Sequence, residues 1–364
     1  MQKRFDWTLL AATILLVTLG LIILYAINFR DPGLAEEFNP THQLMAAILG
    51  LVVLVVASRI DYRFWFRAAP IWYIVSGFLL VLLLVVGETV AGSTRSIDLM
   101  FIEFQPTELA KLGLIFLLAR WYTIRARELR HPWYVFFSLV AAGLIAGLIV
   151  AQPDIGSAVL IGGIWFIMTL ASNVRKVYLA VLIVGVLLVS PFVIQQLQPY
   201  QQERLQTFFQ PESGSRDGGY NVNQSTIAVG SGQIFGRGLG GGTQSQLNFL
   251  PSQHTDFIFA VIAEKLGLLG ATLVIAVFAV LLFRGFYIAL HAKDTFGSLL
   301  ATGLTTLLLF HVVIAIGMNL GVAPVTGLPL PFISYGGTNL IISLLAIGIL
   351  QSISIHKRGL EFRT

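Results

Sequence analysis

A run of polar residues, Ser252 to Asp256, lies directly before a long apolar stretch and carries the first candidate for chemistry. Asp256 is the acid at this junction, where a carboxylate could accept a proton from a hydroxyl group. The same carboxylate could instead cap the following helix by accepting hydrogen bonds from its first amides. Both interpretations of Asp256 stay open at this point.

A second candidate pair lies inside an apolar stretch, where ionisable groups are costly and usually face a cavity. Glu108 and Lys111 are three residues apart, so both lie on one face of a helix. They can form a structural ion pair, or Lys111 can be available to a phosphate group. The spacing does not decide between these two roles.

Five arginines form a third group, because they are predicted to lie on the outer side of a membrane, where positive charge is disfavoured. The planar guanidinium group suits bidentate phosphate binding, although an outer arginine can also pair with a nearby acid. Arg95 and Arg204 are the candidates for binding an anionic headgroup. The five are Arg30, Arg95, Arg204, Arg216 and Arg237.

The composition indicates which class of protein must position these groups. Of 364 residues, 56% are hydrophobic and 11% are charged, whereas soluble domains carry about 25% charged residues. The chain is therefore predicted to be an all-α integral membrane protein. It contains no cysteine, which excludes thiolate nucleophiles and Cys-ligated zinc. Its net charge of +5 is attributed to cytoplasmic loops and not to nucleic-acid binding.

Ten apolar stretches are long enough to cross about 30 Å of hydrocarbon, so residues 1–364 are predicted to form a single membrane domain. The excess of Lys and Arg on one set of loops places both termini in the cytoplasm. Most acids, Asp154 among them, then lie on the outer side. The predicted spans are 7–28, 44–58, 70–87, 106–122, 134–151, 156–171, 177–194, 257–283, 298–318 and 339–355.

Two segments between these spans are predicted to lie on the outer side. Residues 195–255 form the large loop between spans seven and eight; its first part has the apolar spacing of an amphipathic interfacial helix, and its second part is rich in Gly. Residues 319–338 are apolar but contain several prolines and glycines, which prevent a continuous helix. Such backbone is tolerated at membrane depth only where protein or a cavity surrounds it. This outer loop is therefore expected to turn back towards the spans near Asp256.

Several motifs, in this order between the ten spans, carry a resemblance to a known family. They are GSTRSID, QPTELAKLG, QPDIGSAV, ERLQTFFQP, GQIFGRGLGGGTQSQLNFLPSQHTDFIFAVIAEKLG and GLPLPFISYGGTN. The chain resembles the RodA, FtsW and SpoVE family of shape, elongation, division and sporulation proteins over nearly its whole length. FLPSQHTDF is more similar to the RodA branch. Ser252 and Lys265 depart from the family pattern, which commonly has an acid or a lysine at the first position and a second acid at the other.

The resemblance implies a peptidoglycan glycosyltransferase that polymerises lipid II, an undecaprenyl-diphosphate-linked disaccharide pentapeptide, at the outer face of the bacterial cytoplasmic membrane. Such a reaction inverts the anomeric carbon to form a β-1,4 bond, which needs a base for the acceptor hydroxyl and stabilisation of the leaving diphosphate. Asp256 would be the base, and Lys111, oriented by Glu108, would face the diphosphate. The other expected substrate contacts are Arg95, Asp154, Arg204, Gln253, His254 and Ser334.

The expected cofactor is a divalent cation, Mg²⁺ or Mn²⁺, with no ligands assigned; the expected partners are a class B penicillin-binding transpeptidase and elongation-complex proteins.

A lipid II flippase or secondary transporter is the alternative function, because ten spans with buried charges also suit transport. The clustering of the candidate residues in the outer half favours surface chemistry over a path through both leaflets. A purely structural scaffold, the third hypothesis, predicts that Asp256 contributes only to stability.

Overall fold

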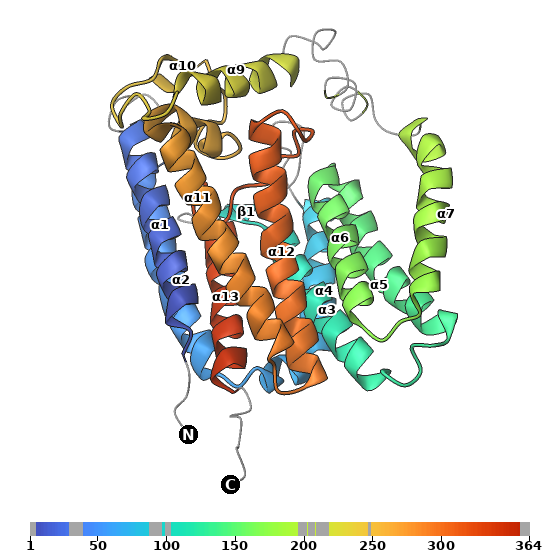
Figure 1. Ribbon diagram of the computed structural model, residues 1–364. Helices are drawn as coiled ribbons and strands as arrows, with labels where there is room; N and C mark the ends of the chain where they lie inside the picture. The colour runs from blue at the N-terminus through green and yellow to red at the C-terminus, as the bar shows by residue number, and fades with distance from the viewer. Residues whose placement is uncertain are drawn as a thin grey trace.

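The computed structural model describes residues 5–28, 39–86, 97–98, 103–195, 202, 208, 218–246 and 249–356. This part of the chain is a bundle of long helices with two shorter helices across one end (Figure 1). The helices are α1 Trp7–Asn28, α2 Pro40–Arg59, α3 Arg63–Val86, α4 Pro106–Ile124, α5 Pro132–Ala151, α6 Ile155–Ala171, α7 Lys176–Gln195, α9 Gly218–Ser231, α10 Thr243–Gln246, α11 Ile258–Leu290, α12 Thr295–Asn319 and α13 Gly337–Ile355. Two-residue strands β1 Ile97–Asp98 and β2 Glu103–Phe104 pair antiparallel, a small departure from the expected all-α class.

Each of the ten apolar stretches predicted to span a membrane is helical in the structure. A helix is expected there because hydrocarbon offers the backbone no hydrogen-bond partners outside the segment itself. In the described ranges, seven helices are long and apolar enough to cross a membrane: α1, α2, α3, α5, α11, α12 and α13. Of the remaining three, α6 is shorter, and α4 carries Glu108, Lys111 and Arg120. The chain is therefore a multi-pass helical membrane protein.

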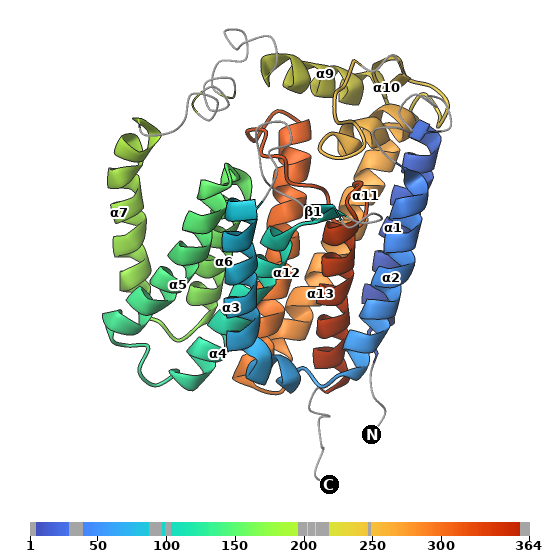
Figure 2. The same cartoon turned by 180° about the vertical axis from the view of Figure 1, so that it is seen from behind.

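The centre of the bundle is formed by α12 and α13, whose residues are mostly buried, whereas most residues of α3 and α5 are not. Both views place α1 and α2 on one side of this centre, and α5 and α7 on the other (Figures 1 and 2). The start of α1 and the end of α13 lie at the same end of the bundle, and α9 and α10 lie across the opposite end.

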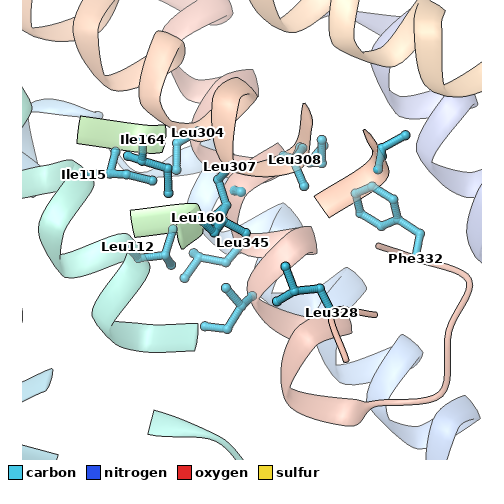
Figure 3. Close-up of a cluster of buried hydrophobic side chains, with 14 of the residues drawn as sticks. Leu112, Ile115, Leu160, Ile164, Leu304, Leu307, Leu308, Leu328, Phe332 and Leu345 are labelled. Carbon is cyan, nitrogen blue, oxygen red and sulfur yellow. The ribbon is translucent and has the colours of Figure 1, made fainter. Parts of the chain in front are cut away.

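Close packing of aliphatic side chains holds α4 and α6 against the centre. Figure 3 shows side chains from α4, α6, α12 and α13 meeting in one cluster, together with two from the loop that precedes α13. Between helices in a membrane such packing acts through van der Waals contacts, because lipid tails are as apolar as leucine side chains. The labelled members are Leu112, Ile115, Leu160, Ile164, Leu304, Leu307, Leu308, Leu328, Phe332 and Leu345.

Helix α11 is interrupted at Gly267, which has φ +69° and ψ −169°. Segment 233–238 supplies backbone partners on both sides of the break: its amides donate to the carbonyls of 264–265, and its carbonyls accept from the amides of 268–269, at 2.8 to 3.2 Å. The predicted span over 257–283 therefore contains a break that was not predicted from the sequence. A broken helix is tolerated here because another part of the chain satisfies the exposed backbone groups.

The two charged residues beside this break, Glu264 and Lys265, are both buried. The Glu264 carboxylate accepts hydrogen bonds from the amides of Gln244 and Ser245 at 2.9 and 3.0 Å. Lys265 Nζ donates to the carbonyl of Leu239 at 2.9 Å. These contacts fix the Gly-rich segment and α10 onto α11, a few residues beyond the polar turn that holds Asp256.

The Pro- and Gly-rich loop between α12 and α13, residues 320–336, packs into the bundle. Its side chains Leu328, Leu330, Phe332 and Ile333 are at most 2% exposed, and a Cβ at Gly20 of α1 would lie 2.7 Å from Ile333 Cα. Glycine is therefore required in α1 for the loop to approach this closely. Non-helical apolar backbone is stable at this position because protein surrounds it.

Candidate functional site

The first half of the candidate site is a charged cluster at the start of α4. Pro106 occupies the first helical position, where its missing N–H costs nothing. The start of the helix at Pro106 determines the directions in which Glu108 and Lys111 point. Lys111 Nζ lies 2.7 Å from Glu108 Oε1, and the two residues are 0% and 2% exposed. A buried lysine of this kind needs a counter-charge, and the spacing of three residues supplies it from the same helix.

His311 of α12 completes this cluster and was not among the site residues predicted from the sequence. Its Nε2 lies 3.2 Å from Lys111 Nζ, and its Nδ1 lies 3.2 Å from the carbonyl oxygen of Pro329 in the loop. Asn339 of α13 hydrogen-bonds to Glu108 through its side chain. The signal that could have identified His311 was present, because an ionisable residue inside an apolar span is a functional candidate by default.

Asp154, expected to contact substrate, lies at the start of α6 and is 4% exposed. Its carboxylate accepts a hydrogen bond from the amide of Ser157 at 3.1 Å and thus caps this helix. It also interacts electrostatically with His311. The structure thus gives Asp154 a capping contact and places it beside the cluster of α4 and α12.

The second half of the candidate site is the turn formed by residues 251–257, which contains Asp256. Helix α11 begins at Ile258, with Phe257 in the N-cap position and no side-chain cap from that residue. Asn319 Oδ1, at the end of α12, accepts a hydrogen bond from the amide of Ala260 at 2.9 Å. A cap normally satisfies an amide of this first turn. The capping role considered for Asp256 is therefore filled at Ala260 by another residue.

Asn319 also holds the turn itself. Its Nδ2 donates to the main-chain carbonyl of Asp256 at 2.8 Å and to that of Ala315 at 2.7 Å, and the residue is 0% exposed. The backbone amide of Asp256 donates to the carbonyl of Ser252 at 3.1 Å. Asp256 is partly exposed, so its backbone is fixed while its side chain can reach solvent.

Replacing Asn319 by alanine is expected to lower both the melting temperature and the activity, because α11 loses its cap and the Asp256 turn loses an anchor. Loss of the cap alone costs about 0.5–2 kcal/mol, and loss of the hydrogen bond to the Asp256 carbonyl adds about 0.5–1.5 kcal/mol. Thermal unfolding of the detergent-solubilised protein measures this effect. Asn223→Ala, an exposed position on α9, is the matched control. Equal melting temperatures for the two variants would contradict the anchoring role.

Ser334 joins the loop to the Asp256 turn. Its Oγ donates to the carbonyl of Thr255 at 2.6 Å and accepts from the amide of Leu330 at 2.9 Å. The next amide, that of Tyr335, donates to the carbonyl of His254 at 2.9 Å, and the two rings meet edge to face with centroids 5.8 Å apart. The loop therefore follows the turn over two successive residues.

His254 and Gln253, expected to contact substrate, lie in this turn. Gln253 is 3% exposed and His254 is partly buried. Burial lowers the pKa of His254 to about 4, so its imidazole is neutral at pH 7 and adds no positive charge beside Asp256. The predicted phosphate ligands Arg95 and Arg204 lie outside the described residues.

Loop 320–336 connects the two halves of the candidate site. The Pro329 carbonyl contacts His311 of the buried cluster, and five residues later Ser334 contacts the turn before α11. Gln43 of α2 holds the far end of the loop, donating to the carbonyl of Ser334 and accepting from the amide of Gly336, both at 3.1 Å. Loop 320–336 thus contacts both the cluster of the buried cation Lys111 and the turn that carries the partly exposed carboxylate of Asp256.

These features define a multi-pass helical membrane protein in which charged side chains are buried between the helices and connected to a polar turn at the bundle's end. The family model of the FtsW, RodA and SpoVE proteins, described as "Cell cycle protein", matches residues 6–359. The chain belongs to this family, which confirms the resemblance found in the sequence motifs.

Relatives with high coverage include three named groups. Peptidoglycan glycosyltransferase MrdB of Escherichia coli (strain K12) is 35% identical over 99% of this chain and 96% of its own length. Stage V sporulation protein E of Bacillus subtilis (strain 168) is 34% identical over 97% of this chain and 98% of its own. The probable peptidoglycan glycosyltransferase FtsW of Trichlorobacter lovleyi is 37% identical over 96% and 93%, respectively.

Solved structures show the same fold. The structure described as "Structural coordination of polymerization and crosslinking by a peptidoglycan synthase complex" matches with a TM-score of 0.82 and 30% identity, over 96% of this chain and 98% of that chain. Thermus thermophilus rod shape determining protein RodA matches with a TM-score of 0.72 and 28% identity, over 98% of each chain.

Proposed function

We propose that this chain is a peptidoglycan glycosyltransferase of the bacterial cytoplasmic membrane that polymerises lipid II into glycan strands for cell-wall elongation and rod shape. The observation that carries the proposal is the loop 320–336, which connects the buried Lys111 cluster to the turn of Asp256. Glycosyl transfer from a lipid diphosphate needs a positive charge and a base in one site. The names of the relatives, peptidoglycan glycosyltransferases among them, support the same reaction.

The reaction is an inverting displacement at the anomeric carbon. The acceptor hydroxyl oxygen forms the β-1,4 bond while the bond from the anomeric carbon to the diphosphate oxygen breaks, and undecaprenyl diphosphate leaves with the electron pair. The hydroxyl proton passes to the carboxylate of Asp256, the general base. Lys111, with Arg95 and Arg204, stabilises the negative charge that develops on the diphosphate.

Lys111 acts from within a fixed environment. A lysine ammonium has three N–H donors, and in the described structure two of them are directed at Glu108 and His311. The third is available to a phosphate oxygen when substrate enters. Donors that are already oriented need no reorganisation during the reaction, which is why preorganised charge is an effective catalyst.

The proposed topology has ten spans, both termini in the cytoplasm, and the active site on the extracytoplasmic face. Support comes from the distribution of Lys and Arg in the sequence and from the position of α9 and α10 at the bundle end opposite the start of α1. The proposed partner on the outer side is a class B penicillin-binding transpeptidase, together with elongation-complex proteins. The matching synthase complex, described as coordinating polymerization and crosslinking, supports such a pairing.

Thiol labelling in intact cells tests this topology, because the chain contains no cysteine. Asn223→Cys, exposed on α9, is expected to react with an impermeant maleimide. Arg127→Cys, exposed between α4 and α5, is expected to react only after the membrane is permeabilised. Labelling of Arg127→Cys in intact cells would reverse the orientation and with it the proposed face of the active site.

A divalent cation, Mg²⁺ or Mn²⁺, is part of the proposal but takes no step in it. Among the residues that the structure describes, no group of three or more His, Asp or Glu side chains is arranged to hold a metal ion. Mg²⁺ is usually bound by one or two carboxylates together with substrate phosphates. The described residues thus form no complete protein site, and the ion would take most of its ligands from lipid II and water.

Incubation of the purified protein with lipid II in detergent, followed by gel separation of the products, tests the function. A glycosyltransferase is expected to yield polymer. A lipid II flippase or secondary transporter, the alternative, has no second compartment in detergent and would leave lipid II unchanged. The transporter remains the alternative because the buried charges of α4 are also typical of a transport path. Absence of polymer with added divalent cation would overturn the proposed function.

A further inference from the structure

We propose that His311 is a positioning residue that holds the ammonium group of Lys111 in a fixed position relative to loop 320–336. This inference rests on the proposed function, since Lys111 is there assigned to the leaving diphosphate. The supporting observation is that one imidazole ring, contributed by α12, lies between the Lys111 side chain of α4 and the Pro329 carbonyl of the loop.

The two contacts define the protonation state of the ring. Lysine can only donate hydrogen bonds, so the Nε2 atom that lies 3.2 Å from Lys111 Nζ must be the acceptor. The hydrogen of the neutral ring is then on Nδ1, which lies 3.2 Å from the Pro329 carbonyl oxygen and donates to it. Both ring nitrogens are satisfied in this tautomer. A doubly protonated ring would instead direct an N–H group at the ammonium group.

The ring supplies a restraint that Glu108 cannot supply alone. Glu108 belongs to the same helix as Lys111, so their ion pair by itself does not fix Nζ relative to α12. His311 belongs to a different helix and is 2% exposed, and its contact therefore fixes Nζ relative to α12. A positive charge must be held within a fraction of an ångström to act on a leaving group, and a misplacement of about 1 Å can cost about 10²-fold in rate.

The second contact connects this restraint to the base. Pro329 lies five residues before Ser334, which donates to the Thr255 carbonyl in the turn of Asp256. A shift of the loop thus moves the His311 contact and the Asp256 turn together. If His311 only stabilised the core, loss of either contact would have a similar effect on activity. If His311 positions Lys111, loss of the Lys111 contact lowers activity more than loss of the Pro329 contact.

Two substitutions separate the two ends of the ring. The amide of glutamine reaches about as far as Nε2, so His311→Gln can still accept from Lys111. The amide of asparagine reaches about as far as Nδ1, so His311→Asn can still donate to Pro329 but loses the Lys111 contact. Thr306→Val is the matched control, because Thr306 is buried in the same helix and its Oγ1 has no hydrogen-bond partner in the described structure.

Polymerisation kinetics with lipid II and thermal unfolding are measured for all three variants. We expect His311→Asn to lower kcat by about 10- to 100-fold with a smaller change in KM. Thr306→Val should stay within about threefold of the unsubstituted protein, and His311→Gln, which keeps the Lys111 contact, should retain clearly more activity than His311→Asn. Equal losses in the two His311 variants, or losses that parallel the melting temperature, would overturn the positioning role. Polymer from the unsubstituted protein tests the proposed function separately.

Nuclear magnetic resonance of ¹⁵N-histidine provides a readout that needs no activity. The His311 signals are assigned by their loss in His311→Gln. We expect Nδ1 to carry the hydrogen and Nε2 to be unprotonated at pH 7, with the Nε2 signal shifting in Lys111→Gln. A hydrogen on Nε2, or an Nε2 signal indifferent to Lys111→Gln, would overturn the inference even if the unsubstituted protein forms no polymer.

Discussion

Replacing Asp256 by asparagine is expected to lower lipid II polymerisation by about 10²- to 10⁴-fold, because loss of a general base typically removes that much rate. Asparagine is nearly the same size and keeps an oxygen acceptor, but it cannot take the proton from the acceptor hydroxyl. Asp256→Ala is expected to be about equally inactive. Gel-based polymerisation by the purified variants measures both effects.

The structure predicts that Asp256→Asn stays folded. The main-chain carbonyl of Asp256 keeps its hydrogen bond from Asn319, and the Ala260 amide keeps its acceptor on the same residue. The melting temperature should therefore change little. Asp61→Asn is the matched control: Asp61 Oδ1 accepts from the amide of Arg63 at 2.9 Å between α2 and α3, and asparagine preserves this contact. Near-normal polymer from a folded Asp256→Asn protein would end the general-base assignment and leave the scaffold hypothesis.

Replacing Lys111 by alanine is expected to abolish polymerisation and to destabilise the protein. The activity is lost because the positive charge beside the diphosphate is gone. Stability falls because Glu108 is then a buried charge without its cation, which costs roughly 3–5 kcal/mol. Lys111→Arg keeps the charge and is expected to retain a small part of the activity, since the larger guanidinium group must fit a site that is 0% exposed.

The double substitution Glu108→Gln with Lys111→Gln separates charge from fold. Removing both charges is expected to restore the melting temperature relative to either single change, while polymerisation stays abolished. The exposed pair Arg125 and Glu128, also three residues apart and 2.8 Å from each other, is the matched control. Its double glutamine variant is expected to be active and stable, because exposed ion pairs contribute about 0–1 kcal/mol. Polymer from the Glu108 and Lys111 double variant would reduce that pair to a structural role.

The helices could be predicted from the sequence because continuous apolar runs of this length have few other stable conformations in a membrane. The break in α11 could not be predicted in this way. Gly267 lies inside a predicted span, and one glycine does not end a helix. The break is stable because segment 233–238 supplies hydrogen bonds from a part of the chain whose position no local pattern predicts.

The candidate site shows the same division between local and distant contacts. The pairing of Glu108 with Lys111 follows from a spacing of three on one helix, and the sequence could suggest it. The contacts of His311 with Lys111 and of Asn319 with Ala260 join residues from different helices. Their partners are visible only once the helices are packed, so the sequence could not show that Asn319 accepts a hydrogen bond from the first turn of α11.

The anchors of the Asp256 turn also determine when the site can exist during synthesis. The Asp256 carbonyl is held by a residue 63 positions later in the chain, and the Thr255 carbonyl by one 79 positions later. The ribosome delivers the chain from its N-terminus, so the turn leaves the ribosome well before either anchor has been made. A copy that stops before Ser334 carries the carboxylate but not the segment that places it. Unfinished chains inserted into the membrane should therefore be inert.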